Sequence, residues 1–221
     1  MRGLWGLIVL ALAITGWTNV ELDASPQAAA PTSSGPTLDE TAQWLEPHLM
    51  GVVHTSRKTV VTFQAKKGKE PKEVDRQVYN TLESVSAASF DGCSLTIGQL
   101  TKGDDYSIVT LSTVPLGHLT GASLKVEQID GAKTQNGEES TETSIVPGSV
   151  VVITLESSSN VITWKKKSTG SVPLELDLLP FEGQSSSLEI YSDDDAMPPR
   201  LVKAFNHAIE LCHVNEKPEP F

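Results

Sequence analysis

Two cysteines and two of the five histidines are the residues of this chain whose types suggest metal chemistry. Imidazole and thiolate groups are natural zinc ligands, and Cys93, His207, Cys212 and His213 carry them. The H-x4-C-H spacing of the last three matches no standard structural zinc site. On a helix, His207 and Cys212 also point about 140° apart around the axis. The pattern therefore favours a buried cysteine and a surface histidine, and we predict no metal ligands.

The sequence lacks the usual motifs of nucleophilic catalysis and of nucleotide binding. The sequence contains no G-x-S-x-G, no glycine-rich phosphate loop and no C-x-x-C-H. Serines are abundant in expected loops such as residues 157–159, and pairing one of them with His118 or His207 is arbitrary. A cluster of His118, Asp91 and a serine in one cleft would revive a hydrolase. We predict no catalytic residue and no cofactor.

Charged clusters have simpler explanations than ligand binding. Residues 193–195 are three aspartates without the glycine turn and bidentate acid of a calcium loop, so we expect them to cap a helix. The lysines of residues 66–72 and 165–167 would contact anionic lipid if the fold made them neighbours, but solvated turns are favoured. Without residues 1–30 the chain keeps 16 basic and 26 acidic residues, a net charge of −10. This charge does not suit general binding of nucleic acid.

The amino terminus indicates export. Arg2 precedes an apolar run over residues 4–14, about half the length that a membrane-spanning helix needs. This profile is typical of a secretory signal peptide, with an uncleaved anchor as the alternative. We expect a signal peptide over residues 1–30, a flexible linker over residues 31–36, and a periplasmic or extracellular protein.

An oxidising compartment would let Cys93 and Cys212 form a disulfide. In the chain-entropy model such a loop stabilises the fold by about 4–5 kcal/mol. Two buried free thiols are the alternative, because cysteine is among the most buried residue types. Both alternatives stay open here, since pairing depends on how closely the two Cβ atoms approach.

The elements that must position these residues begin with a helix. Thr37 and Glu40 form a T-x-x-E capping box, and apolar residues recur at i, i+4, i+7 and i+11 from Leu38. Because proline lacks an N–H, this helix should stop near Glu46 or kink at Pro47. From about residue 59 to 191 the apolar period changes to two, which predicts strands. We expect strands at 60–63, 77–89, 94–100, 106–114, 122–129, 150–155, 161–165, 172–179 and 188–191, with a mobile loop at 131–143. A weak helix is the alternative for residues 77–89.

The last element is an amphipathic helix. Pro198 and Pro199 suit its first turn, and apolar residues from Leu201 to Cys212 form one broad face. We therefore predict an α+β fold: an N-terminal helix, an antiparallel sheet or small barrel of about seven strands, and a C-terminal amphipathic helix. Residues 37–215 should form a single β-rich domain, followed by a flexible tail at 216–221.

Residues 199–212, PRLVKAFNHAIELC, resemble the C-terminal signature of exported bacterial proteins of unknown function. Those proteins pair an Ala-Phe-x-His helix ending in Leu-Cys with a Gly-Cys strand, here residues 91–95, and with a Trp-Leu helix, here residues 41–45. The resemblance implies no activity. It does imply that His207 makes a hydrogen bond from the helix to the barrel, with a solvated imidazole as the alternative. The order of elements is also similar to that of a pleckstrin-homology-like barrel, which does not determine function.

We therefore expect an exported non-enzymatic binding or interaction module. Its partner would be another protein or an envelope component, reached by strand addition at an open sheet edge. A carrier for small apolar ligands is one alternative, favoured by a barrel cavity of about 300 Å³ or more. An unrecognised hydrolase is the other. Nucleic-acid binding is not expected, peripheral membrane contact is disfavoured, and the oligomeric state is open.

Overall fold

The computed structural model describes residues 35–66, 69–136, 138–172 and 180–215. These residues fall within one compact unit, Gly35–Phe221. The expected signal peptide, the first part of the linker, most of the strand expected at 172–179, and the tail at 216–221 lie outside the described residues. None of the helices in the described ranges is long and apolar enough to cross a bilayer.

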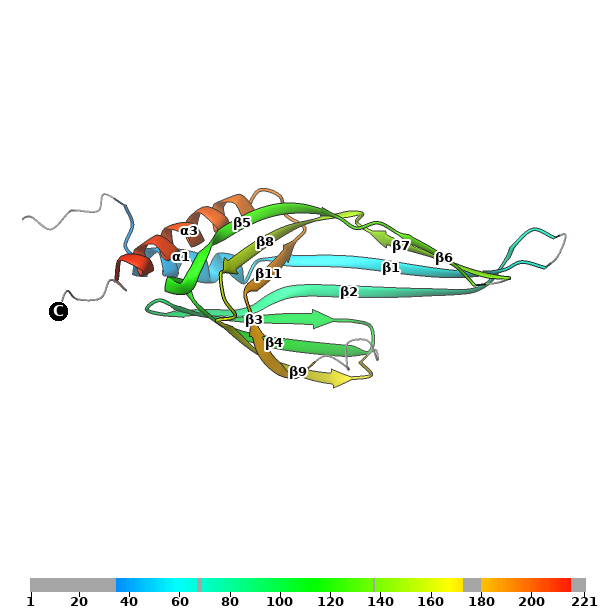
Figure 1. Ribbon diagram of the computed structural model, residues 1–221, viewed down its shortest axis with the longest axis horizontal. Coiled ribbons are helices and arrows are strands. Elements are labelled where there is room, and N and C mark those ends of the chain that lie inside the picture. Colours follow the sequence, from blue (N-terminus) through cyan, green and yellow to red (C-terminus); the bar gives the residue numbers. More distant parts are fainter. Residues whose placement is uncertain (1–34, 67–68, 137, 173–179, 216–221) are drawn as a thin grey trace, which may run out of the picture. The chain divides into compact units, whose positions relative to one another are not determined.

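Antiparallel strands make up most of the described residues of this unit, together with two α-helices (Figure 1). The larger sheet has eight strands in the spatial order β10-β9-β4-β3-β2-β1-β7-β6. Its strands are β1 (Val53–Gln64), β2 (Lys72–Asp91), β3 (Ser94–Lys102), β4 (Tyr106–Pro115), β6 (Ala132–Asn136), β7 (Glu139–Val146), β9 (Ile162–Gly170) and β10 (Glu182–Ser185). The smaller sheet, in the order β11-β8-β5, contains β5 (Leu119–Gln128), β8 (Ser149–Ser157) and β11 (Ser187–Ser192). The helices are α1 (Leu38–Leu49) and α3 (Pro198–Asn215), and a 3-10 turn η1 (Leu116–His118) joins β4 to β5.

The predicted α+β class with antiparallel strands is confirmed, but the sheet does not close into a barrel. β6 and β10 are the two edges of the larger sheet and do not pair with each other. The predicted strand at 150–155 corresponds to β8, which is central in the smaller sheet. β10 was not predicted, because its four residues, EGQS, carry no apolar period.

The first helix forms as its sequence predicts at its start, and of the two alternatives for its end the stop near Glu46 is wrong. The hydroxyl of Thr37 accepts from the Glu40 amide at 3.2 Å, and the Glu40 carboxylate accepts from the Thr37 amide at 2.7 Å. This reciprocal capping box satisfies two amide donors at the start of α1. The helix then passes through Pro47 and ends at Leu49 rather than at Glu46.

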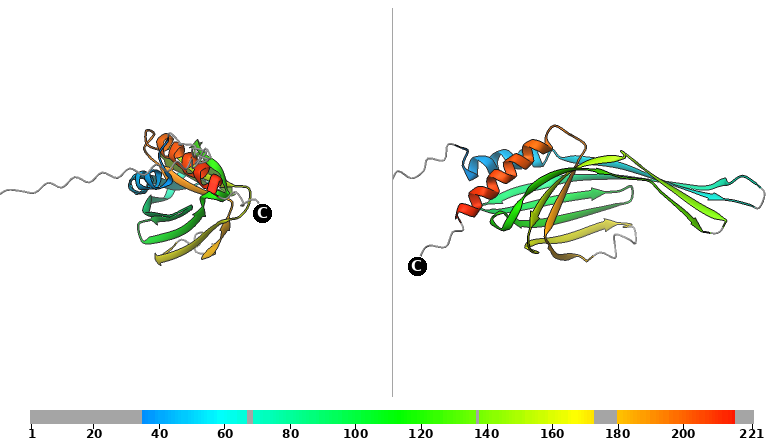
Figure 2. Two further views of the ribbon diagram at one scale, coloured as in Figure 1. Left: turned by 90° about the vertical axis from the view of Figure 1, so that its left-hand side faces the viewer. Right: turned by 45° about the horizontal axis from the view of Figure 1, so that its top comes forward.

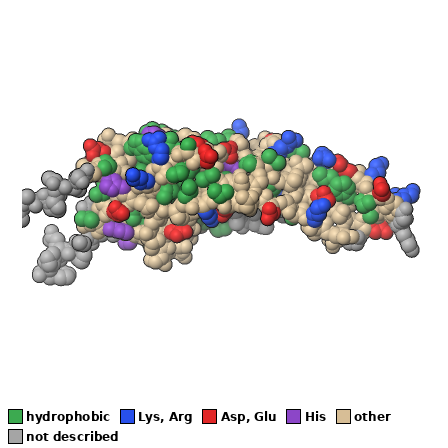
Figure 3. Space-filling model, turned by 90° about the horizontal axis from the view of Figure 1, so that it is seen from above, with side chains coloured by type: hydrophobic (Ala, Val, Ile, Leu, Met, Phe, Trp, Pro, Cys, Tyr) green, Lys and Arg blue, Asp and Glu red, His purple; other side chains and the backbone are tan. Residues whose placement is uncertain are grey.

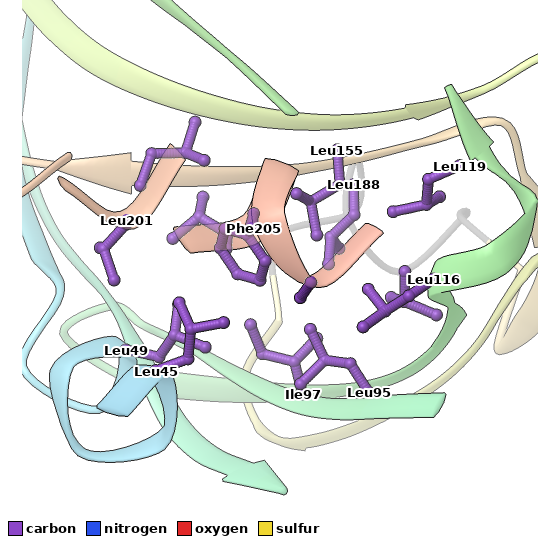
Figure 4. Packing of buried hydrophobic residues seen from close by; sticks show 14 of the residues in the cluster. Leu45, Leu49, Leu95, Ile97, Leu116, Leu119, Leu155, Leu188, Leu201 and Phe205 are labelled. Atoms are coloured by element: carbon purple, nitrogen blue, oxygen red, sulfur yellow. The ribbon is translucent and has the colours of Figure 1, made fainter. Parts of the chain in front are cut away.

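The core lies where α1 and α3 pack against the sheets. The fully buried face of α3 includes Leu201, Phe205, Ala208 and Cys212, as its apolar pattern predicted. Figure 4 shows Phe205 among side chains from α1, β3, η1, β8 and β11. One helix face therefore contacts both sheets and the other helix.

The strands β1 and β2 extend beyond this core as a single layer with β7 and β6, which we call the arm (Figure 2). The arm consists of residues 57–64, 72–81, 132–136 and 139–146. None of these residues is fully buried. Basic and acidic side chains lie side by side near its end (Figure 3). The mobile loop predicted at 131–143 is therefore wrong: it is the β6–β7 hairpin, held by pairing of β7 with β1.

Hydrogen bonds connect α3 to the small sheet, but not through the predicted residue. Asn206 accepts from the Ala122 amide at 2.8 Å and donates to the Ala122 carbonyl at 2.9 Å, as a neighbouring strand would. His213 donates to the carbonyl of Leu119 at 3.0 Å. His207 instead donates to the carbonyl of Pro36 at 2.8 Å, so its partner is the segment before α1 and not a strand.

Cys93 and Cys212 are paired as a disulfide, with their Cα atoms 5.6 Å apart. Cys93 lies in the turn between β2 and β3, and Cys212 lies on the buried face of α3. The bridge therefore connects the larger sheet to α3 across 119 residues of sequence.

Removing this bridge should lower the free energy of unfolding. The Cys93→Ser/Cys212→Ser double variant is expected to lose about 4–5 kcal/mol, because the unfolded chain regains the entropy of a long loop. Urea unfolding followed by circular dichroism, with and without reductant, measures this loss. The double variant has no bridge to reduce, so it shows whether the reductant itself changes the urea midpoint. Equal urea midpoints for wild type with and without reductant would contradict the prediction.

Candidate functional site

A cleft of about 380 Å³ lies between the larger sheet and β11. Five strands contribute the side chains that matter for its chemistry: Glu83 on β2, Gln99 on β3, Thr110 and Ser112 on β4, Trp164 on β9, and Tyr191 on β11. Nine of the fifteen lining residues are Ser, Thr, Gln or Glu. The cleft is therefore a polar site with two aromatic side chains.

Strand alternation decides which side chains enter the cleft. Thr110 and Ser112 line it, whereas Val109 and Leu111 lie on the other face of β4 and are exposed. On β2 the pairing with β3 shifts register between Val85 and Ala87, which marks a β-bulge beside the cleft. Bulges bend a strand and redirect its side chains.

Trp164 is positioned by a glycine on the neighbouring strand. Gly183 pairs with Trp164 across β9 and β10, and a Cβ on Gly183 would lie only 2.7 Å from Cζ2 of the indole. The indole therefore occupies the space that a side chain on β10 would take. On its other neighbour, β4, Trp164 is paired with the buried Ser112.

Asp193 fastens the end of β11 to β1. One carboxylate oxygen accepts from Nδ1 of the buried His54 at 2.6 Å, and the other accepts from the amide and the hydroxyl of Thr55, each at 2.8 Å. The Asp193 amide also donates to the carbonyl of Val53. Burial works to raise the pKa of Asp193, but the hydrogen bonds from His54 and Thr55 together lower it. The expected capping of α3 by Asp193 is therefore wrong, because this side chain bonds to a distant strand.

The pKa values of the two carboxyls in the cleft are shifted in opposite directions. Burial raises the pKa of Glu83, and the neighbouring His54 works against this shift. The hydroxyl of Tyr191 donates to Glu189 at 2.7 Å and lowers its pKa, assisted by Lys125. Burial and this hydrogen bond raise the pKa of Tyr191. Glu189 is thus held ionised by its partners, while the protonated form of Glu83 is favoured by its surroundings.

Gln99 connects the two walls of the cleft. Its side-chain amide donates to the carbonyl of Glu189 at 2.7 Å, which joins β3 to β11. Neither Gln99 nor Trp164 was singled out from the sequence. Trp164 is an aromatic residue in one expected strand and Gln99 an amide in another. Such residues are too common in strands to predict a site.

The residues considered for metal or hydrolytic chemistry do not meet in this cleft. Cys93 and Cys212 form the disulfide, and no group of three His, Cys, Asp or Glu residues in the described ranges could hold a metal ion. Neither His118 nor Asp91 is among the described residues that line it. The two lysine clusters also stay apart, because β3 and β4 separate β9 from β2 in the sheet.

Two further clefts flank the start of the arm. One of about 430 Å³ is lined by Val126, Pro147 and Asp193, among others. The other, of about 520 Å³, runs between Arg57, Asn80, Lys102 and Val146. Each is lined by residues from strands and connecting turns, and neither contains an aromatic side chain among its described residues.

Comparison with known proteins gives no relative. No family model, no curated protein and no solved structure matches this chain.

The elevated pKa of Glu83 predicts a pH-dependent stability. Because the pKa in the folded protein lies above the ordinary value of 4.5, the unfolded chain ionises first, and the fold loses stability as pH rises past that value. Glu83→Gln cannot ionise and therefore removes this loss. The stability of the variant minus that of wild type should be larger at pH 7 than at pH 4. Urea midpoints at both pH values test this, with the exposed Glu156→Gln as control. An equal difference at the two pH values would refute the burial argument.

Proposed function

We propose that this protein is an exported, non-enzymatic binding module whose ligand occupies the cleft between the larger sheet and β11. The observation that carries the proposal is the convergence of polar side chains and a fixed indole from strands β2, β3, β4 and β9 with those of β11. Binding sites commonly combine a concave shape with a few placed polar groups. The disulfide is compatible with export, since such bonds persist in oxidising compartments.

The polar lining weighs against the two alternatives. By size alone a cleft of about 380 Å³ meets the criterion for an apolar-ligand carrier. Carriers need a mainly hydrophobic lining, however, and only four of the fifteen lining residues are aliphatic. A hydrolase would need a nucleophile, or an acid and a base, arranged around one reacting atom. Glu189 is already engaged by Tyr191 and Lys125, which favours a structural role for this carboxylate.

Blocking the cleft tests the proposal. Thermal unfolding would be measured with neutral sugars, amino acids, nucleotides, fatty acids and choline as probes. A probe that binds in the cleft at about 100 times its Kd should raise Tm by roughly 5–10 °C. The Thr110→Trp variant should abolish this shift, because the indole would fill the cleft, whereas Val109→Trp on the opposite face should retain it.

The outcome is decisive in both directions. A shift that survives in Thr110→Trp places the ligand elsewhere and contradicts the proposal. The absence of a shift with every probe also counts against a small-ligand site. Turnover of any probe would contradict its non-enzymatic character.

A second candidate function is binding of a protein partner by strand addition. Residues 72–81 of β2 pair with β1 on one side, and β3 begins to pair only at Leu82. The amide of Asn80 donates to the Asp104 carboxylate at 3.4 Å, so residues 72–79 of β2 keep an open edge at which an extended segment could pair. The partner would be a protein or an envelope component.

Photo-crosslinking tests this second function in the cells that express the protein. A photoreactive residue replacing Val74, which is exposed on the open part of β2, should give one specific adduct. The same residue replacing Val109, which is also exposed but lies on a strand paired on both sides, is the control. Equal adducts at the two positions, or none at position 74, would contradict strand addition.

A further inference from the structure

The lining of the cleft excludes several ligand classes. Phosphates and carboxylates need cationic partners, and none of the described lining residues is Lys or Arg. Apolar ligands need a mainly hydrophobic lining, and only four of the fifteen lining residues are aliphatic. A cation would need a free carboxylate, yet Glu189 is already paired with Lys125, and burial raises the pKa of Glu83 and so opposes its ionisation. A neutral, polar ligand remains.

The side chains that line the cleft can bind many hydroxyl groups at once. Thr101, Thr110 and Ser112 each carry a hydroxyl that both donates and accepts, and Gln99 carries an amide. The carboxyl of Glu83 adds two oxygens that can accept hydrogen bonds. These groups come from three adjacent strands, so they lie in rows across the sheet and suit a ligand with several hydroxyls around a ring.

Trp164 supplies an aromatic surface beside these hydroxyls, on the same face of the sheet, because it pairs with Ser112. Its indole is half-buried, lines the cleft, and occupies the space that a Cβ on Gly183 would need. A rigid aromatic surface loses little conformational entropy on binding and packs against flat, weakly polar C–H surfaces. Sugar rings combine such a C–H face with hydroxyls at the rim.

We infer that the cleft binds a neutral saccharide, with Trp164 beneath the ring and the Ser, Thr and Gln side chains of β3 and β4 around its hydroxyls. This inference rests on the proposed binding function and names its ligand class. The cleft volume of about 380 Å³ is at the small end of ligand sites, so it suits a short segment or the end of a longer glycan.

Isothermal titration calorimetry of the full-length chain tests the inference. The probes are neutral hexasaccharides of cellulose, xylan, mannan, chitin, laminarin and starch. At least one should bind to wild type, and Trp164→Ala should weaken that binding by about tenfold or more. Thr110→Val, which keeps the side-chain shape and removes one hydroxyl, should also weaken it. Trp44→Phe, which changes an indole on α1, should leave affinity unchanged.

The variants and probes separate failure of this inference from failure of the proposed function. Circular dichroism confirms folding of each variant, and Thr110→Val remains informative if Trp164→Ala does not fold. If no hexasaccharide binds while choline, palmitate or AMP binds and is blocked by Thr110→Trp, the saccharide inference is overturned and the binding function stands. If saccharides bind equally to wild type and to Thr110→Trp, the cleft is not the site. If no probe of any class binds, both proposals fail.

Discussion

Burial of one face of α3 is the interaction on which the rest of the structure depends. Phe205 and Leu201 are fully buried on this helix and belong to the same core as Leu45 of α1, Ile97 of β3 and Leu155 of β8. Burying a large apolar side chain contributes about 1.5–3 kcal/mol, so a face of this size provides a major share of the stability. The apolar residues of the two sheets share this core with those of the helices and are not buried by sheet-to-sheet contact alone. The helix fills the space between them.

The cleft follows from how β11 is held beside this core. β11 immediately precedes the segment that leads into α3, so the helix fixes one end of the strand. Asp193 fastens that same end to β1 through His54 and Thr55, and Gln99 fastens the middle of the strand to β3. Ile190, between these attachments, is buried in the core, and residues 187–191 of β11 line the cleft beside the larger sheet. The polar side chains of β2, β3 and β4 therefore face a cleft and not a packed interior.

Local signals in the sequence predicted the helices well and the long-range contacts poorly. The capping box at Thr37 and the apolar face of α3 depend on residues within one or two turns, so their period is visible in the chain. The β6–β7 hairpin has no apolar period because both faces of the arm are exposed, and its strands are held by pairing with distant β1. Asp193 resembled a helix cap, but its partner His54 is 139 residues away. The contact between Trp164 and Gly183 likewise required knowing that β9 and β10 pair.

The arm and the cleft share β2, and this strand has two different environments along its length. Up to Thr81 it belongs to a single exposed layer, whose ion pairs such as Arg76 with Glu73 are exposed and contribute little. The charges on that part of the strand still matter, because they discourage indiscriminate pairing at an open edge. From Glu83 onward β2 has β3 beside it. The carboxyl of Glu83 lines the cleft, and burial raises its pKa. β1 pairs with both parts, with a register shift between Thr62 and Phe63 in the arm, so a ligand at Glu83 and a partner on the open part of β2 would contact one strand at separate places without competing.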